Sequence, residues 1–256
     1  MSHSPPFTIS VANKSGTIQS YAVFSEVPTI RSSGTAPGIS KKSTIRIITS
    51  VKGVSSGEGV GYFTLSKKLY AVCGTYDVDG DPGEGNEERS PAGTGTEVID
   101  HKLVTSGKID ATGKAIGGSL LEVDSSGGSP AFVKGYGQEP MGEVDCFAIR
   151  TRSEFTSQEA KRNKFILGFT SSMRRTVGFH ATFIPGPNQT YQVKPSKIFY
   201  VAIGSYNARD IVKNSLRTAT ATFRVDFEEL GIDDVQLVHD ERGNLQRLVM
   251  EGAEEE

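Results

Sequence analysis

The sequence predicts an all-β protein, an antiparallel β-sandwich or jelly roll of about sixteen short strands with at most one short helix. Three observations lead to this class. Apolar and polar residues alternate with a period of two from near the N-terminus. Most apolar runs are separated by glycine or proline, of which the chain has 29 and 11. Strands do not alternate with long amphipathic helices, which argues against a parallel α/β sheet.

The first strands form a predicted hairpin. Phe7, Ile9 and Val11 point one way in the alternation, the turn residues Asn-Lys-Ser-Gly follow at 13–16, and 21–24 is the second strand. Residues 31–43, rich in Ser, Gly, Thr and Pro, are expected to be a long loop. Further strands are expected at 44–51, 59–65, 69–75, 96–105, 115–123, 131–134, 145–151, 165–170, 176–184, 191–194, 198–205, 218–227, 235–239 and 245–250.

One helix is expected, over Ser157–Asn163. This segment has a serine cap and a Glu-to-Lys spacing but little apolar surface. We expect residues 1–6 to be a disordered N-terminus, 7–250 a single sandwich domain and 251–256 an acidic tail. Two strand-rich halves flank the turn-rich stretch 124–143. A sandwich to which both halves contribute explains this pattern, and two small β-domains are the alternative.

Composition and charge narrow the cellular setting. No apolar run approaches the roughly 20 residues of a membrane helix. The N-terminus lacks the basic and apolar regions of a signal peptide, so we expect a cytoplasmic protein without membrane contact. The net charge of −2 gives no general attraction to nucleic acid. A basic stretch at 150–175 contains three phenylalanines, a combination that can bind single-stranded nucleic acid. No RNA-binding motif accompanies it, so nucleic acid is not an expected partner.

Several strings resemble those of a known group of proteins: Asn-Lys-Ser-Gly at 13–16 followed by Gln-Ser-Tyr-Ala-Val-Phe at 19–24, Tyr-Ala-Val-Cys-Gly-Thr at 70–75, and Pro-Gly-Pro-Asn-Gln-Thr-Tyr at 185–191 leading into 199–206. Together they resemble a family of uncharacterised small β-sandwich proteins, mostly fungal and some bacterial, that lack signal peptides. The resemblance covers most of the chain and implies a fold. It implies no catalytic residue, because that family has no established activity. The chain departs from the family at 77–95, where an acidic, glycine-rich insertion replaces a short neutral turn.

The acidic insertion contains the sharpest local motif. Its acids Asp77, Asp79, Asp81 and Glu88 fall at positions 1, 3, 5 and 12 of a calcium-binding loop, where oxygen ligands can surround a cation. Pro82 stands where that loop needs glycine, and the preceding sequence is strand-like. The insertion is therefore interpreted either as a solvated hairpin tip or as a Ca²⁺ site.

Other cofactors are not expected. The chain has no phosphate-binding loop, dinucleotide fingerprint or nucleophile elbow, and its four histidines lack a paired metal spacing. His101, His180 and a carboxylate assembled in space are the remaining metal alternative. Cys73 and Cys146 lie in apolar runs and are expected to be buried, inert thiols. The alternation around His180 indicates a half-exposed sheet histidine.

The candidate ligand-binding residues combine hydroxyl-tipped aromatics, imidazoles and a guanidinium that suits a carboxylate. They are Tyr70, His101, Arg150, His180 and Tyr200.

Three functions follow from these features. The first is a protein that binds a small, partly apolar molecule, such as a cofactor-independent cyclase or isomerase of fungal secondary metabolism. The second is a cytosolic lectin-like module, with or without calcium. The third is a structural protein that self-assembles through its sheet edges. The expected partners are accordingly a small molecule, a glycan or further copies of the chain.

Overall fold

The computed structural model describes residues 5–32, 41–76, 96–125, 128–133, 141–172 and 179–248. Of these residues, 53% lie in strands and 7% in helices, so the all-β class is confirmed. No helix in the described part of the chain is long and apolar enough to cross a membrane. The calcium-loop motif Asp77, Asp79, Asp81 and Glu88 lies outside the described residues.

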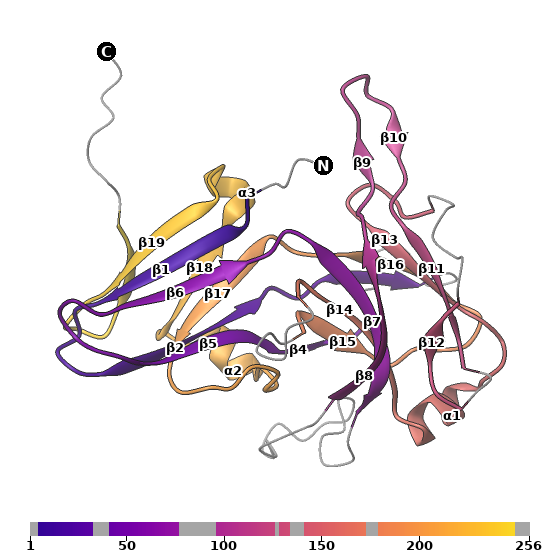
Figure 1. Ribbon diagram of the computed structural model, residues 1–256, viewed down its shortest axis with the longest axis horizontal. Coiled ribbons are helices and arrows are strands. Elements are labelled where there is room, and N and C mark those ends of the chain that lie inside the picture. The colour runs from indigo at the N-terminus through magenta and orange to yellow at the C-terminus, as the bar shows by residue number, and fades with distance from the viewer. Residues whose placement is uncertain are drawn as a thin grey trace.

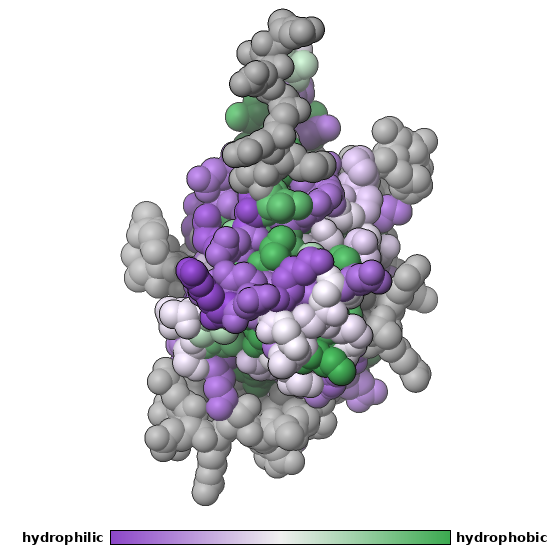
Figure 2. All heavy atoms as spheres, turned by 90° about the vertical axis from the view of Figure 1, so that its left-hand side faces the viewer, coloured by the Kyte–Doolittle hydropathy of each residue, from purple (hydrophilic) through white to green (hydrophobic). Residues whose placement is uncertain are grey.

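Two sheets lie face to face on one side of the molecule (Figure 1). The outer sheet has the order β20 (Leu245–Arg247), β19 (Asp234–His239), β1 (Phe7–Asn13) and β6 (Val60–Leu65). The shared sheet has the order β18 (Thr222–Asp226), β17 (Ile198–Ile203), β2 (Gln19–Ser25) and β5 (Ile47–Val54). Seen from the left-hand side of Figure 1, the described surface is mostly hydrophilic, with apolar residues scattered among polar ones (Figure 2).

Two further sheets and a hairpin make up the other side (Figure 1). The β13 sheet has the order β12 (Ala131–Phe132), β11 (Leu120–Asp124), β13 (Phe147–Thr151), β16 (Thr190–Lys194) and β3 (Thr29–Ser32). The β14 sheet has the order β4 (Thr44–Ile45), β15 (Ala181–Phe183), β14 (Phe165–Thr170), β7 (Leu69–Tyr76) and β8 (Thr96–Val104). The strands β9 (Lys108–Ile109) and β10 (Ala115–Ile116) form a hairpin that projects from the body.

The described residues form twenty strands instead of the expected sixteen or so. The predicted strands 44–51 and 115–123 are each two strands, and β3 and β9 lie where no strand was expected. The second split follows from Gly118, whose backbone approaches the Cys146 carbonyl so closely that a Cβ atom would stand 2.0 Å from its oxygen. Four larger sheets, each with strands from both halves of the chain, replace the expected two.

Two strand pairs are parallel, which the antiparallel prediction missed. β1 pairs with β19, and β11 pairs with β13; the other pairs of described strands are antiparallel. Parallel neighbours need a crossover connection. β1 and β19 lie near opposite ends of the chain, and more than twenty residues separate β11 from β13, so both pairs have room for one. Alternation within one strand carries no information about the direction of its neighbour.

The two central strands of the shared sheet, β2 and β17, are buried on both faces. Tyr21 and Val23 of β2 belong to an apolar cluster with residues of the outer sheet, whereas Ala22 and Phe24 belong to a second cluster with residues of the β13 and β14 sheets. In β17, odd and even positions divide between the two clusters in the same way. A strand covered on both faces is a continuous apolar run, as 21–24 is in the sequence.

Three short helices occur in the described residues, where at most one was expected: α1 (Ser157–Arg162), α2 (Asn214–Arg217) and α3 (Phe227–Leu230). The cap of α1 is Thr156, one residue before the expected serine, and it forms a capping box with Glu159. α3 begins after Asp226, whose side chain accepts two backbone N–H groups, and ends at Gly231 in the left-handed conformation.

Candidate functional site

Tyr70 and His101 are the predicted site residues that lie together. Their rings approach edge to face, with centroids 6.2 Å apart, on the adjacent strands β7 and β8. Tyr70 is half-buried and His101 is exposed. None of the three pockets described below includes either residue.

His180 is buried, with 3% of its surface exposed, so the prediction of a half-exposed histidine was wrong. Its ring lies between Phe169 and Phe199, at centroid distances of 5.3 and 5.9 Å. Nε2 has no hydrogen-bond partner among the described residues. Burial lowers the pKa of His180 to about 4, so the ring is neutral at pH 7. The prediction assumed that one strand face meets solvent, whereas apolar rings from two sheets enclose this side chain.

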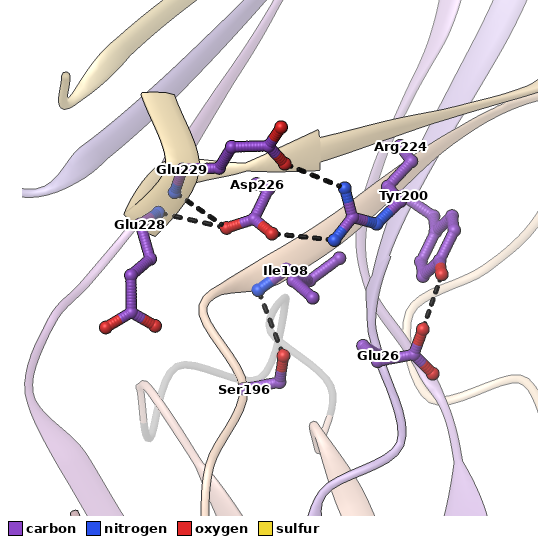
Figure 3. A network of polar contacts seen from close by, with 8 residues as sticks. All are labelled: Glu26, Ser196, Ile198, Tyr200, Arg224, Asp226, Glu228 and Glu229. Carbon is purple, nitrogen blue, oxygen red and sulfur yellow. Dashed lines mark hydrogen bonds and ion pairs between the residues drawn. The ribbon is translucent and has the colours of Figure 1, made fainter. Parts of the chain in front are cut away.

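Tyr200 connects the shared sheet to α2 and does not line any of these pockets. Its hydroxyl donates to Glu26, which also accepts from Arg217 at the end of α2 (Figure 3 shows the Tyr200 contact). Its ring stacks on Phe24 with centroids 5.2 Å apart. Burial, together with the Glu26 carboxylate, raises the pKa of Tyr200. These contacts satisfy the hydroxyl group inside the fold.

Arg150 lies on β13, half-buried, and its Nη2 is 3.3 Å from the sulfur of Met141. Both cysteines are free and buried, as expected, and burial raises the pKa of Cys73 to about 12. Among the described residues, no group of three potential ligands could hold a metal ion. Of the five predicted ligand-binding residues, Tyr70 and His101 lie on the β14 sheet and meet. Arg150 lies on the β13 sheet, Tyr200 lies on the shared sheet, and His180 directly precedes β15.

Two surface pockets of nearly equal size differ in how their charges are paired. The first, here called the acid-rimmed pocket, has a volume of about 390 Å³. Its lining consists of Val27, Thr29, Lys194, Pro195, Ser196, Lys197, Ile198, Asp226, Glu228 and Glu229. Figure 3 shows the polar contacts along this wall.

Each ionised side chain of the acid-rimmed pocket has a partner within the protein. Lys194 lies 3.0 Å from Asp145, and Lys197 lies 3.3 Å from Glu228. Arg224 contacts Asp226 at 2.6 Å and also Glu229 (Figure 3). Each of these charges therefore lies beside an opposite charge of the same chain.

The second pocket, here called the lysine pocket, has a volume of about 410 Å³. It is lined by Lys41, Lys42, Thr44, Ser157, Lys161, Phe183, Ile184, Pro185 and Gly186. Three of these residues are basic and none is acidic. The ion pairs within the described part of the chain do not include any of the three lysines.

Three segments far apart in the sequence, 41–44, 157–161 and 183–186, line the lysine pocket. The Lys41 N–H donates to the Ile30 carbonyl at 2.7 Å, which fixes the chain just before β4. β4 pairs with β15, which brings this segment beside Phe183. Ser157 and Lys161 are four residues apart on α1 and therefore lie on one side of that helix.

The floor of the lysine pocket is apolar and rigid. Phe183 is buried, and its ring packs against that of Tyr191 with centroids 5.0 Å apart. The Gly186 N–H donates to the Tyr191 hydroxyl at 2.6 Å, and the Thr151 hydroxyl donates to the Gly186 carbonyl at 2.7 Å. The floor is thus held from below by side chains of the β13 sheet.

Lys41 is the most enclosed of the three lysines. It is half-buried, whereas Lys42 and Lys161 are exposed. Its Nζ lies 5.5 Å from the centroid of the Tyr191 ring. Burial lowers the pKa of Lys41 below the ordinary lysine value. Little in the sequence indicates this site, since its lysines come from a loop and a short helix about 120 residues apart.

Comparisons with known proteins leave the family open: no protein-family model, curated protein or solved structure matches this chain. The resemblance to the fungal and bacterial family therefore stays a prediction.

Proposed function

We propose that the chain binds a small, anionic, partly apolar molecule in the lysine pocket. The observation that carries the proposal is the grouping of three lysines, without a carboxylate among the described lining residues, around an apolar floor. Like charges that share a pocket repel one another, and a carboxylate or phosphate between them removes this repulsion and gains charge-assisted hydrogen bonds.

The size of the pocket agrees with this class of ligand. Sites for small molecules have volumes of roughly 300–1,000 Å³ and combine apolar walls with a few polar groups. The lysine pocket, at about 410 Å³, lies near the lower end of that range. Phe183, Ile184 and Pro185 supply the apolar contact, and Thr44 and Ser157 supply hydroxyl groups. A cofactor-independent cyclase or isomerase remains the enzyme class that we propose for such a site.

Calorimetric titration with benzoate and with pyrophosphate tests the proposal. We expect both anions to bind and the neutral analogue benzamide to bind much more weakly. Lys42→Gln and Lys161→Gln should each weaken anion binding about ten-fold, the effect of about 1.4 kcal/mol. The matched control is Lys197→Gln, which removes a paired lysine from the acid-rimmed pocket and should leave binding within about two-fold. Equal affinities in all three variants would contradict the proposal.

A lectin-like function is the second candidate, and one surface residue favours it. Tyr62 on β6 is 71% exposed and lines a pocket of about 240 Å³ on the outer sheet. A sugar ring can stack on such an exposed aromatic face. Binding of a neutral monosaccharide in the same titrations, with neither anion bound, would favour this candidate over the first.

We also propose that residues 7–250 form one sandwich-like domain that works in the cytosol. The shared sheet supports the single domain, because each of its faces belongs to a different apolar cluster and the two clusters cannot separate without breaking it.

A further inference from the structure

Lys41 differs from its two neighbours in the lysine pocket in ways that matter for chemistry. Its backbone is anchored by the hydrogen bond to Ile30, and its side chain is half-buried beside the Tyr191 ring. Lys42 follows it directly in the sequence but is exposed. The pocket therefore contains one amine in a defined, partly dry position and two at its solvent side.

A lysine amine is a nucleophile only in its neutral form. Enzymes favour this form by removing the amine from water, by placing it near other cations and by keeping carboxylates away. Phe183, Ile184 and Pro185 provide the apolar surroundings. Two further lysines line the same pocket, and no ion pair of the described residues includes Lys41. Burial lowers the pKa of Lys41, which favours the neutral amine.

We propose that Lys41 forms an imine with a carbonyl compound whose carboxylate or phosphate is held by Lys42 and Lys161. The Nζ lone pair attacks the carbonyl carbon, the C=O π electrons move to oxygen, and a proton passes from nitrogen to that oxygen. The nitrogen lone pair then forms the C=N bond as the C–O bond breaks, and the departing oxygen takes the second proton of the amine and leaves as water. No electrons are gained or lost, so no oxidant or reductant is needed. A protonated imine draws electrons from the adjacent carbon, which suits an isomerase without a cofactor. This inference rests on the proposed anion-binding function.

Reductive trapping on the intact chain tests the imine. The protein is incubated with pyruvate and sodium cyanoborohydride, which reduces an imine to a stable secondary amine, and modified lysines are located by mass spectrometry of peptides. We expect the adduct at Lys41 to exceed that at Lys42 and Lys161 at least ten-fold. Acetone, which has the carbonyl group but no anion, should modify Lys41 much less than pyruvate does.

Two arginine variants serve as matched controls. Lys41→Arg keeps a cation in place but has no nucleophilic amine, so trapping at this position should vanish. Lys197→Arg changes a paired lysine of the acid-rimmed pocket and should leave trapping at Lys41 in place. Pyruvate adducts spread evenly over the lysines of the wild-type protein would overturn the inference, and this measurement needs no variant to fold.

The titrations with benzoate and pyrophosphate separate the two proposals. Anion binding that depends on Lys42 and Lys161, without selective trapping at Lys41, would overturn the imine and leave the proposed function standing. Anion binding that is unaffected by Lys42→Gln and Lys161→Gln would overturn both.

Discussion

The lysine pocket and the acid-rimmed pocket are similar in size and opposite in electrostatics. Both are hollows of about 400 Å³ beside the end of a strand. In the acid-rimmed pocket, Lys194, Lys197 and Arg224 each face a carboxylate of the same chain. In the lysine pocket, none of the three lysines takes part in an ion pair of the described residues. Charges paired within the protein are matched by the fold, whereas charges without an ion pair among the described residues are available to a ligand. This difference in pairing, and not a difference in volume, supports the proposed binding site.

The largest expected difference between the two pockets concerns their apolar walls. Phe183 is buried beneath the lysine pocket, whereas Val27 in the acid-rimmed pocket is 37% exposed. Phe183→Ala should lower the free energy of unfolding by about 3–5 kcal/mol, because it leaves a cavity next to Tyr191. Val27→Ala should change it by less than about 0.5 kcal/mol. Urea denaturation measures both, and equal losses would show that the two floors do not differ as described.

His180 is an ionisable side chain that lies in the core and not at a pocket, and its protonation should change the free energy of unfolding. Its folded pKa of about 4 lies below the unfolded value of about 6.5. Between these two values the unfolded chain binds more protons than the folded one, so stability is complete above pH 6.5 and falls as the pH drops towards 4. The loss at pH 4 should approach about 3 kcal/mol.

Denaturation midpoints measured from pH 7 to pH 4 reveal this effect against a matched variant. His180→Leu should flatten the decline, while His101→Leu, which removes an exposed imidazole, should leave it unchanged. An equally steep decline in wild type and His180→Leu would show that another group causes it.

The smallest expected effect concerns a paired acid of the acid-rimmed pocket. Asp226 caps α3 and contacts Arg224, so Asp226→Ala should cost about 1–2 kcal/mol of stability. Burial raises the pKa of Asp226. The N–H groups of Glu229 and Glu228 and the Arg224 guanidinium together lower it by more, so the pKa lies below the ordinary aspartate value. This stabilisation is present above the unfolded pKa of about 3.9 and is lost as the pH falls through the folded pKa.

Lys161→Ala is the counterpart in the lysine pocket. It should cost no stability, because no ion pair of the described residues is removed. Chemical denaturation at pH 7 compares the two variants. A larger loss for Lys161→Ala than for Asp226→Ala would contradict the assignment of paired charges to the fold and unpaired charges to a ligand.

Local patterns predicted the strands well and the site poorly. The apolar run 21–24 and the alternation at Phe7, Ile9 and Val11 correspond to β2 and β1, because side-chain direction in a strand repeats every two residues. α3 was missed although Asp226, two following glutamates and Gly231 form a recognisable cap and stop. The burial of His180 could not be predicted, since Phe199, which covers it, comes from another sheet.

The sequence alone determined the all-β class, the positions of most strands and the turns between them, because these depend on the period of apolar residues and on Gly, Pro and Asn at particular positions. Only the tertiary structure decided which strands are neighbours, which two pairs are parallel and that the central strands of one sheet are covered on both faces. It also decided that Lys41 and Lys161 share a pocket. Contacts between distant segments depend on how the sheets pack, and that information is not contained in any local stretch of the chain.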